Sequence, residues 1–155
     1  MMEIKEVENY EDLEGIKAIF LEYAQSLNVD LCFQSFDEEL ADLTKLYAPP
    51  KGCILAAYEG EHLAGAVALK KIGEGICEMK RLYVKPSFRK FGTGRRLVEL
   101  LIEKAKEKNY ILMKLDTLDI LQPAIALYRS FGFKETTAYY HNPLAGVVYM
   151  ELALH

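Results

Sequence analysis

Long apolar runs, an excess of basic residues and abundant cysteine are all missing from this chain of 155 residues, and each absence excludes a class of protein. The longest apolar run, residues 63–69, is far shorter than the ~18 residues that a membrane-spanning helix needs. Residues 1–6 contain no apolar signal core. Lysines and arginines total 19 against 23 aspartates and glutamates, and this net charge of −4 argues against nucleic acids and anionic membranes as partners. We therefore expect a soluble, cytoplasmic protein.

The three cysteines and three histidines form no pattern that suits a metal site or a disulfide framework. No Cys-x-x-Cys spacing occurs, and an odd, sparse count is typical of free thiols in a reducing compartment. Cys77 has no histidine beside it to activate it, so a buried thiol is a simpler interpretation than a nucleophile. We expect no metal site, and we expect the histidines to be exposed to solvent. The residues concerned are Cys32, Cys53, Cys77, His62, His141 and His155.

What the chain does contain is an ordinary globular composition. Hydrophobic residues make up 51% of it and charged residues 27%. A chain of about 150 residues typically folds as one domain and buries a sizeable core without metal or disulfide support. Disorder is excluded, because it requires low hydrophobicity and high net charge. We expect a single domain over residues 1–155.

The hydrophobic pattern predicts both helices and strands. Apolar residues at spacings of three and four predict four helices, and β-rich runs between turn residues predict six to seven strands. The passage from the strand at 76–84 through a helix to the strand at 111–115 requires a right-handed crossover, and therefore a parallel pair. The predicted fold class is α+β, with a mixed, mostly antiparallel sheet. The expected helices are 10–27, 35–47, 94–109 and 123–131, and the expected strands are 2–7, 53–58, 62–72, 76–84, 111–115, 133–140 and 147–152.

The segment Arg-Lys-Phe-Gly-Thr-Gly at 89–94 lies between a predicted strand and a predicted helix. Its glycines allow close approach of a ligand and positive φ angles, and N–H groups at a helix N-terminus favour anions, of which a diphosphate is the natural one. Arg95 and Arg96 strengthen this interpretation, because positive charges in a first helical turn are unfavourable without an anion. The alternative is an ordinary glycine turn with two solvated arginines. A P-loop and a Rossmann fingerprint are excluded, since no Gly-Lys-Ser/Thr follows and Leu97 stands at the third glycine position.

Two motifs together resemble a known family. The run Arg89-x-x-Gly92-x-Gly94 follows the strand residues 79–84 and precedes Ala-Ile-Ala-Leu-Tyr-Arg-Ser-Phe-Gly-Phe at 124–133. In this order and spacing they resemble the GNAT superfamily of acetyl-CoA-dependent N-acetyltransferases. The order of the predicted elements also matches that family over nearly the whole chain.

The resemblance implies that the fourth and fifth strands splay apart and hold the pantetheine arm of acetyl-CoA between them. The backbone of Leu82, Tyr83 and Val84 would pair with the pantetheine amides, and one N–H there would bind the thioester carbonyl. Such a donor stabilises charge that exists only in the transition state. The side chains of Arg89 and Lys90 would either assist in binding the diphosphate or lie along the adenosine phosphate in solvent. The backbone positions implied for the diphosphate are Lys90, Phe91, Gly92, Thr93, Gly94 and Arg95.

Two residues are candidates for catalysis. Tyr128 stands where the family commonly places a general acid, which would protonate the departing thiolate; the alternative is a tyrosine that only packs beside its helix. Glu78, on the central strand shortly before the acyl-binding stretch, is the candidate general base, acting directly or through a water. Its alternatives are a structural pair with Lys80 or Arg81, or binding of a cationic substrate. Many members of the family carry an asparagine seven residues before the tyrosine, and Leu121 stands there instead, so this contact with the cofactor is apolar or made by the backbone.

Two segments are expected to line the acceptor pocket. The family usually builds one wall from the region before the second helix, which here holds Gln34 and Ser35, although Ser35 also fits a capping box with Glu38. The other segment is the loop between the last two strands, where Tyr140 and Asn142 offer aromatic and amide groups to a small polar ligand. Plain hairpin packing is the alternative for this loop.

The resemblance thus implies an acetyl-CoA-dependent N-acetyltransferase that acts on a primary amine of a small molecule. Direct attack in a ternary complex is expected, because no activated nucleophile is visible in the sequence. Two alternatives stay open, acetylation of a protein or peptide amine and a non-catalytic sensor that only binds acyl-CoA. The family often dimerises through its last strands, so a homodimer is among the implied assemblies. Acetylation of aminoacyl-tRNA fits poorly with a net charge of −4.

Overall fold

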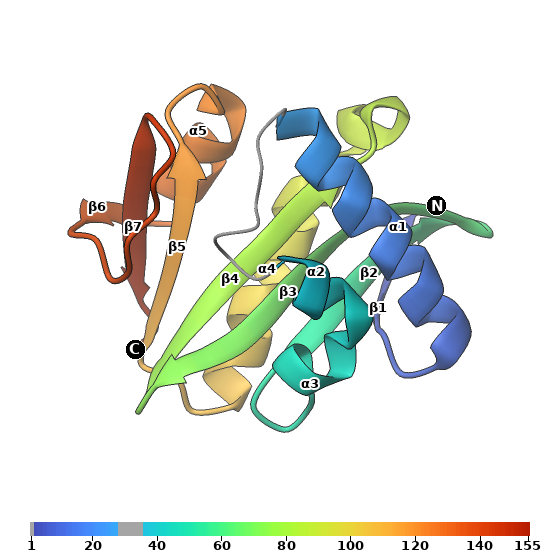
Figure 1. Ribbon diagram of the computed structural model, residues 1–155, viewed down its shortest axis with the longest axis horizontal. Coiled ribbons are helices and arrows are strands. Elements are labelled where there is room, and N and C mark those ends of the chain that lie inside the picture. Colours follow the sequence, from blue (N-terminus) through green and yellow to red (C-terminus); the bar gives the residue numbers. More distant parts are fainter. Residues whose placement is uncertain (1, 28–35) are drawn as a thin grey trace.

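The computed structural model describes residues 2–27 and 36–155, apart from the side chains of Tyr10 and Lys90 (Figure 1). This part of the chain forms a sheet of seven strands in the order β1-β2-β3-β4-β5-β7-β6. Neighbouring strands are antiparallel except β4 and β5, which are parallel. The predicted α+β class with a mixed, mostly antiparallel sheet is confirmed. The strands are β1 (Met2–Glu6), β2 (Cys53–Glu59), β3 (His62–Gly73), β4 (Ile76–Val84), β5 (Leu112–Leu118), β6 (Lys134–Thr136) and β7 (Val147–Ala153).

The described residues form five α-helices instead of the expected four, because the segment expected as the second helix is divided. A carboxylate oxygen of Asp42 accepts a hydrogen bond from the backbone N–H of Lys45 at 3.3 Å. This is the bond that an N-cap residue makes, and it begins a new helix within the segment. The helices are α1 (Tyr10–Leu27), α2 (Phe36–Ala41), α3 (Leu43–Tyr47), α4 (Thr93–Glu107) and α5 (Gln122–Ser130).

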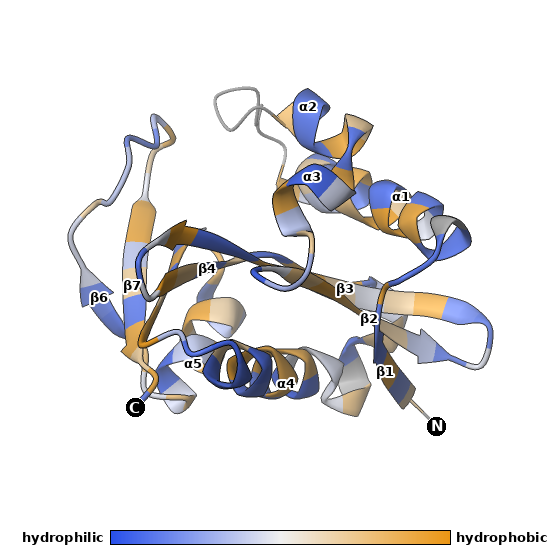
Figure 2. Cartoon of the chain, turned by 90° about the horizontal axis from the view of Figure 1, so that it is seen from below, coloured by the Kyte–Doolittle hydropathy of each residue, from blue (hydrophilic) through white to orange (hydrophobic). Residues whose placement is uncertain are grey.

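Helices cover both faces of the sheet (Figure 2). The helices α1, α2 and α3 lie on one face, and α4 and α5 lie on the other. Each group covers its own cluster of buried apolar side chains, which includes Ile16, Phe20 and Leu43 on the first face and Leu97 and Leu101 on the second. The amphipathic spacing of α1 and α4 therefore corresponds to burial against the sheet.

The parallel strands β4 and β5 are paired only at their beginning. Residues 76–78 of β4 pair with residues 112–114 of β5, whereas β4 continues to Val84 and β5 to Leu118. Figure 1 shows the two strands diverging beyond the paired residues. The later backbone groups of β4 thus have no partner in β5, which confirms the predicted splay and leaves a slot in the middle of the sheet.

A β-bulge lies in β4 where the slot opens. The register between β3 and β4 shifts between Ala66 and Ala68, opposite Arg81, whose φ angle is 61°. A bulge of this kind bends its strand and re-aims a side chain. The Arg81 side chain accordingly lies on the face covered by α1 to α3, where it pairs with Glu39 of α2.

The strand expected at 133–140 is much shorter than predicted. Only Lys134–Thr136 forms β6. Beyond it, Tyr139 donates a hydrogen bond to Glu78 on β4, and Tyr140 donates one to Asp116 on β5. These side chains are bound to the central strands, so the backbone leaves the edge of the sheet.

Candidate functional site

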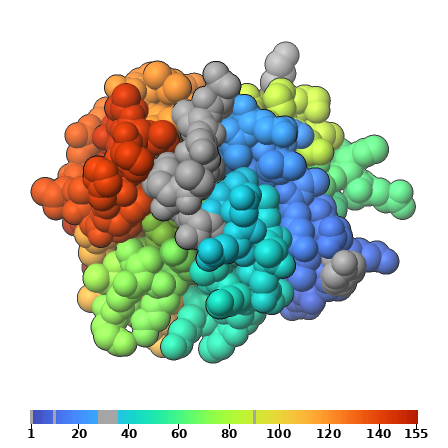
Figure 3. All heavy atoms as spheres, in the orientation of Figure 1, coloured from blue at the N-terminus to red at the C-terminus, as the bar shows by residue number. Residues whose placement is uncertain are grey.

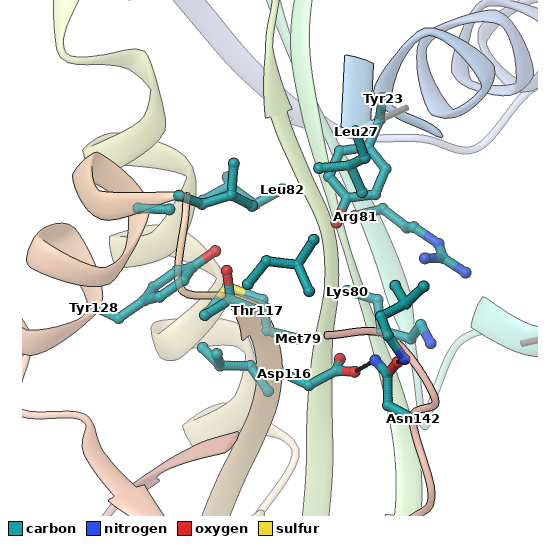
Figure 4. Close-up of a pocket in the computed structure, with 15 residues that line it drawn as sticks. Tyr23, Leu27, Met79, Lys80, Arg81, Leu82, Asp116, Thr117, Tyr128 and Asn142 are labelled. Atoms are coloured by element: carbon teal, nitrogen blue, oxygen red, sulfur yellow. Dashed lines mark hydrogen bonds between the residues drawn. The ribbon is translucent and has the colours of Figure 1, made fainter. Parts of the chain in front are cut away.

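The slot between β4 and β5 belongs to a channel made of two adjoining cavities. One cavity, of about 370 Å³, reaches from Arg89 and Gly94 at the start of α4 to the slot. The other, of about 70 Å³ and drawn in Figure 4, continues to Asp116 and Asn142. On the face shown in Figure 3, the atoms of α1 and α2 lie together on one side, and those of the C-terminal strands lie on the other. The two cavities share Tyr23, Leu27, Leu82, Leu121 and Ala124.

The start of α4 leaves backbone N–H groups available to an anion. The segment expected as a glycine loop is a 3₁₀ helix, Pro86–Phe91, that ends at Gly92, whose φ of 69° lies in the left-handed region. None of the described side chains caps α4, and the first N–H groups of a helix have no partner within it. The N–H groups of Thr93, Gly94 and Arg95, at the positive end of the helix dipole, therefore fit a phosphate.

The arginines around this end of the channel differ in their contacts. Arg89 lines the channel, and its Nε donates a 2.8 Å hydrogen bond to the carbonyl of Val84. Arg95 donates to Ser130 Oγ at 3.1 Å, and Arg96 pairs with an acid of its own helix. The charge of Arg96 in the first turn of α4 thus has an acidic partner, whereas Arg95 contacts only the neutral Ser130 hydroxyl and the ring of Phe131 among the described residues.

The residues predicted to bind acetyl-CoA fall into two groups. Those that line the channel are Leu82, Tyr83, Val84, Arg89 and Gly94. Phe91 lies outside it, with 68% of its surface exposed. Gly92, Thr93 and Arg95 do not line it either, and the side chain of Lys90 is not among those described. Leu121, which replaces the asparagine common in the family, lines both cavities, so its apolar side chain is positioned to contact a ligand in the channel.

Tyr128 of α5 lies in the middle of the channel. Its side chain is 7% exposed, and its ring packs edge-on against Phe133 with centroids 5.8 Å apart. Its hydroxyl points into the space between the strands (Figure 4) and makes no hydrogen bond with another residue of 2–27 or 36–155. Burial, more than any nearby charge, raises the pKa of Tyr128. The phenol therefore stays protonated at neutral pH and has a proton to donate.

The far end of the channel is polar. Oδ2 of Asp116 accepts hydrogen bonds from the Tyr140 hydroxyl and, at 2.8 Å, from Nδ2 of Asn142. Tyr149 stabilises this arrangement, because its hydroxyl donates to the Tyr140 carbonyl at 2.8 Å and accepts from the Asn142 N–H at 3.2 Å. Asp116 and Asn142 line the cavity together with Lys80 and hold the loop that was predicted to face an acceptor.

Glu78 is buried beside this end, and it does not line the cavity that contains Tyr128. Its side chain is 3% exposed, Oε2 accepts a 2.5 Å hydrogen bond from Tyr139, and Oε1 lies 3.8 Å from Lys70 Nζ and 3.9 Å from Lys80 Nζ. Burial and the Glu78 charge raise the pKa of Tyr139, which is therefore the donor. The role of Glu78 as general base stays a prediction.

Sequence reasoning missed Asp116 as a residue of the site. The sequence did contain a signal, because Asp116 is an acid directly after the expected strand 111–115. The proximity of Asp116 to Tyr140 and Asn142, however, depends on the pairing of β5 with β7. Gln34 and Ser35, the other residues predicted for the acceptor pocket, lie outside the described residues.

The remaining candidates are consistent with structural roles. Burial raises the pKa of Cys53 to about 11 and that of Cys77 to about 12, so both are unreactive thiols, while Cys32 lies outside the described residues. His62, His141 and His155 are exposed, as predicted. In the described ranges no cluster of side chains suits a metal ion, and no helix there has the length and apolarity to cross a membrane.

Comparisons with known proteins agree with this architecture. Residues 13–133 match the family described as acetyltransferase (GNAT) family. An uncharacterized N-acetyltransferase of Schizosaccharomyces pombe is 47% identical over 146 residues, which cover 93% of this chain and 90% of that protein. A crystal structure of an acetyltransferase from Streptococcus agalactiae superimposes with a TM-score of 0.81 at 23% identity, covering 98% of both chains. An acetyltransferase of Salmonella typhimurium, solved with its cofactor acetyl-CoA, superimposes with a TM-score of 0.75 at 20% identity, covering 100% of this chain and 95% of that one. The chain therefore belongs to the GNAT family and is an acetyltransferase.

Proposed function

We propose that this protein transfers the acetyl group of acetyl-CoA to a primary amine of a small molecule, by direct attack in a ternary complex. The observation that carries the proposal is the continuous channel, which has free helix N–H groups at one end, Tyr128 in the middle and Asp116 at the other end. A long, flexible thioester with a diphosphate at one end fits this order of groups.

In this proposal the diphosphate of acetyl-CoA binds at the N-terminus of α4 and its pantetheine arm lies in the slot. The backbone of Leu82, Tyr83 and Val84 borders the slot where β4 has no partner in β5. The backbone groups of this stretch that face β5 are therefore available to the pantetheine amides and to the thioester oxygen, which becomes negative when the amine attacks. The Val84 carbonyl is the exception, because it accepts the hydrogen bond from Arg89. The acetyltransferase of Salmonella typhimurium with the same fold was solved with acetyl-CoA, which supports acetyl-CoA as the ligand of this channel.

The chemical step needs a proton donor and a proton acceptor. The amine nitrogen forms a bond to the thioester carbon, the C–S bond breaks, and the sulfur takes a proton from the Tyr128 hydroxyl. Before it attacks, the ammonium of the acceptor must lose a proton to a base, because only the neutral amine has a lone pair. Glu78 was predicted for this role, and Asp116 is the second candidate because it lines the same cavity as Tyr128.

The dependence of kcat/KM on pH distinguishes the two carboxylates. With a base in place, the rate rises as that carboxylate ionises; without one, only the neutral amine reacts, so the rise moves up to the pKa of the amine itself. We expect the rise in kcat/KM to shift to higher pH in Asp116→Asn and to stay at the wild-type pH in Glu78→Gln. The opposite pattern would give the role to Glu78.

Gly94 offers a direct test of the cofactor end. A Cβ on Gly94 would lie 3.8 Å from Leu127 and Val84, an ordinary contact, so Gly94→Ala is expected to fold normally. Its methyl group would nevertheless occupy the channel, and crowding of this size costs 1–3 kcal/mol, which corresponds to about tenfold weaker CoA binding or more. Calorimetric titration of CoA measures the change, and Gly73→Ala, at a site equally free of clashes, is the control. Equal CoA affinity in wild type and Gly94→Ala would contradict this placement.

The whole reaction is tested by the release of free thiol from acetyl-CoA in the presence of amines. We expect release only when an amine is added, and no burst of thiol with acetyl-CoA alone. A burst equal to the enzyme concentration would indicate an acyl-enzyme in place of a ternary complex. Binding of CoA without release by any small amine would favour the sensor or the peptide alternative.

A further inference from the structure

Lys80 is a buried ammonium that faces the polar end of the channel. Its side chain is only 9% exposed, and the residue lines the cavity with Asp116 and Tyr128 (Figure 4). Within residues 2–27 and 36–155, Nζ of Lys80 makes no hydrogen bond, and its nearest acid oxygen is Oε1 of Glu78 at 3.9 Å. Burial lowers its pKa, against the opposing effect of Glu78. Among the described residues, the ammonium of Lys80 is therefore left with donors that have no acceptor.

The neighbouring charges do not satisfy Lys80. Oε1 of Glu78 is shared with Lys70 at 3.8 Å, and Oε2 is bound by Tyr139. Arg81, which also lines the cavity, is already paired with Glu39, since its Nε and Nη2 lie 3.1 and 2.9 Å from the two carboxylate oxygens. A charged donor that is buried without a partner costs free energy, which a ligand oxygen would recover.

Asp116 supplies the opposite charge in the same cavity. Its Oδ2 is bound by Tyr140 and Asn142, whereas its Oδ1 accepts no hydrogen bond from the described residues. The charge of Asp116 is near enough to favour the protonated form of Lys80. Both residues line one cavity, and in the part of the chain that the structure describes, one carboxylate oxygen of Asp116 and the ammonium of Lys80 have no hydrogen-bond partner.

From this pair we infer that the acceptor is a small amine that also carries a carboxylate, an amino acid in the broad sense. This inference rests on the proposed function. The ammonium of the acceptor would lie on Asp116 and its carboxylate on Lys80, which directs the nitrogen toward the thioester beside Tyr128. An amine without a carboxylate would leave Lys80 without a ligand oxygen, and a diamine would place a second cation against Lys80.

The experiment compares matched amines as acceptors in the thiol-release assay. Each set contains a free amino acid, its amide and the amine without the carboxyl group, and the amino acids are glycine, alanine, phenylalanine and glutamate. A series of ω-amino acids of increasing length finds the preferred spacing between the ammonium and the carboxylate. We expect the carboxylate-bearing member of the best set to have at least tenfold higher kcat/KM. In Lys80→Met this preference is expected to fall below about twofold, through a rise in KM with kcat nearly unchanged.

Lys70→Met is the matched control. Lys70 lies on the same face of the sheet and equally close to Glu78, but it does not line the cavity, so the carboxylate preference should persist. Higher kcat/KM for the amides or the simple amines, or a preference that survives in Lys80→Met, would overturn the inference and leave the transferase standing. If Lys80→Met does not fold, the matched sets with the wild-type enzyme still decide. Thiol release with none of the amines would contradict both proposals.

Discussion

Replacement of Tyr128 by phenylalanine is expected to lower kcat about 100-fold while the affinity for CoA stays within twofold. A general acid contributes roughly 10² to 10⁴ to a rate, and the Tyr128 hydroxyl is in the middle of the channel with no hydrogen-bond partner among the described residues. Phenylalanine preserves the contact of the ring with Phe133. Because burial raises the pKa of Tyr128, the wild-type enzyme should retain this acid throughout the neutral range and well into alkaline pH.

The measurement is steady-state kinetics of both proteins, with CoA binding by calorimetry. Tyr110→Phe is the control, since the Tyr110 hydroxyl donates to the Lys51 carbonyl at 2.6 Å and does not line the channel. Its kcat should remain at the wild-type value. An unchanged kcat in Tyr128→Phe would remove the role of Tyr128 as acid.

The largest expected effect on stability concerns the ion pair between Arg81 and Glu39. The two side chains are 5% and 1% exposed, and Arg81 also lies against the rings of Tyr23 and Phe36, at 6.0 and 5.1 Å from their centroids. In Arg81→Met the carboxylate of Glu39 would stay buried without a partner, which costs about 3–5 kcal/mol of the free energy of unfolding. Removal of both charges in Glu39→Leu/Arg81→Met should restore most of that loss.

Urea unfolding of the wild type, the single variant and the double variant measures both effects. For a domain of this size, the single change corresponds to a decrease in Tm of about 6–20 °C. A single variant as stable as the wild type would show that the pair does not hold α2 against the bulge of β4. A double variant no better than the single one would mean that Arg81 stabilises the fold through its contacts with the rings of Tyr23 and Phe36 and not through the ion pair with Glu39.

The elements with a strong local pattern were predictable from sequence. The bounds of α1 are those that its apolar spacing predicts, and the strand at 76–84 is found as β4. The glycine motif at 89–94 also lies, as expected, before a helix. In each case the residues that decide the structure are neighbours in the sequence.

The elements that were missed depend on contacts between distant parts of the chain. The early end of β6 follows from hydrogen bonds of Tyr139 and Tyr140 to strands elsewhere in the sheet. In the same way, the cavity that Lys80 and Asp116 line together depends on the separation of β4 and β5 beyond their paired residues. A division of the second helix at Asp42 was readable in principle, because aspartate is a strong N-cap residue, yet the continuous apolar spacing favoured one helix.

The central claim is that the channel between β4 and β5 binds acetyl-CoA. Hydrogen–deuterium exchange with and without saturating CoA tests it most directly, because backbone N–H groups are the proposed ligands. We predict slower exchange at Leu82, Tyr83 and Val84 and at residues 93–95, with β1 and β2 unchanged. Unchanged exchange at both segments, with protection elsewhere in the chain, would contradict the account.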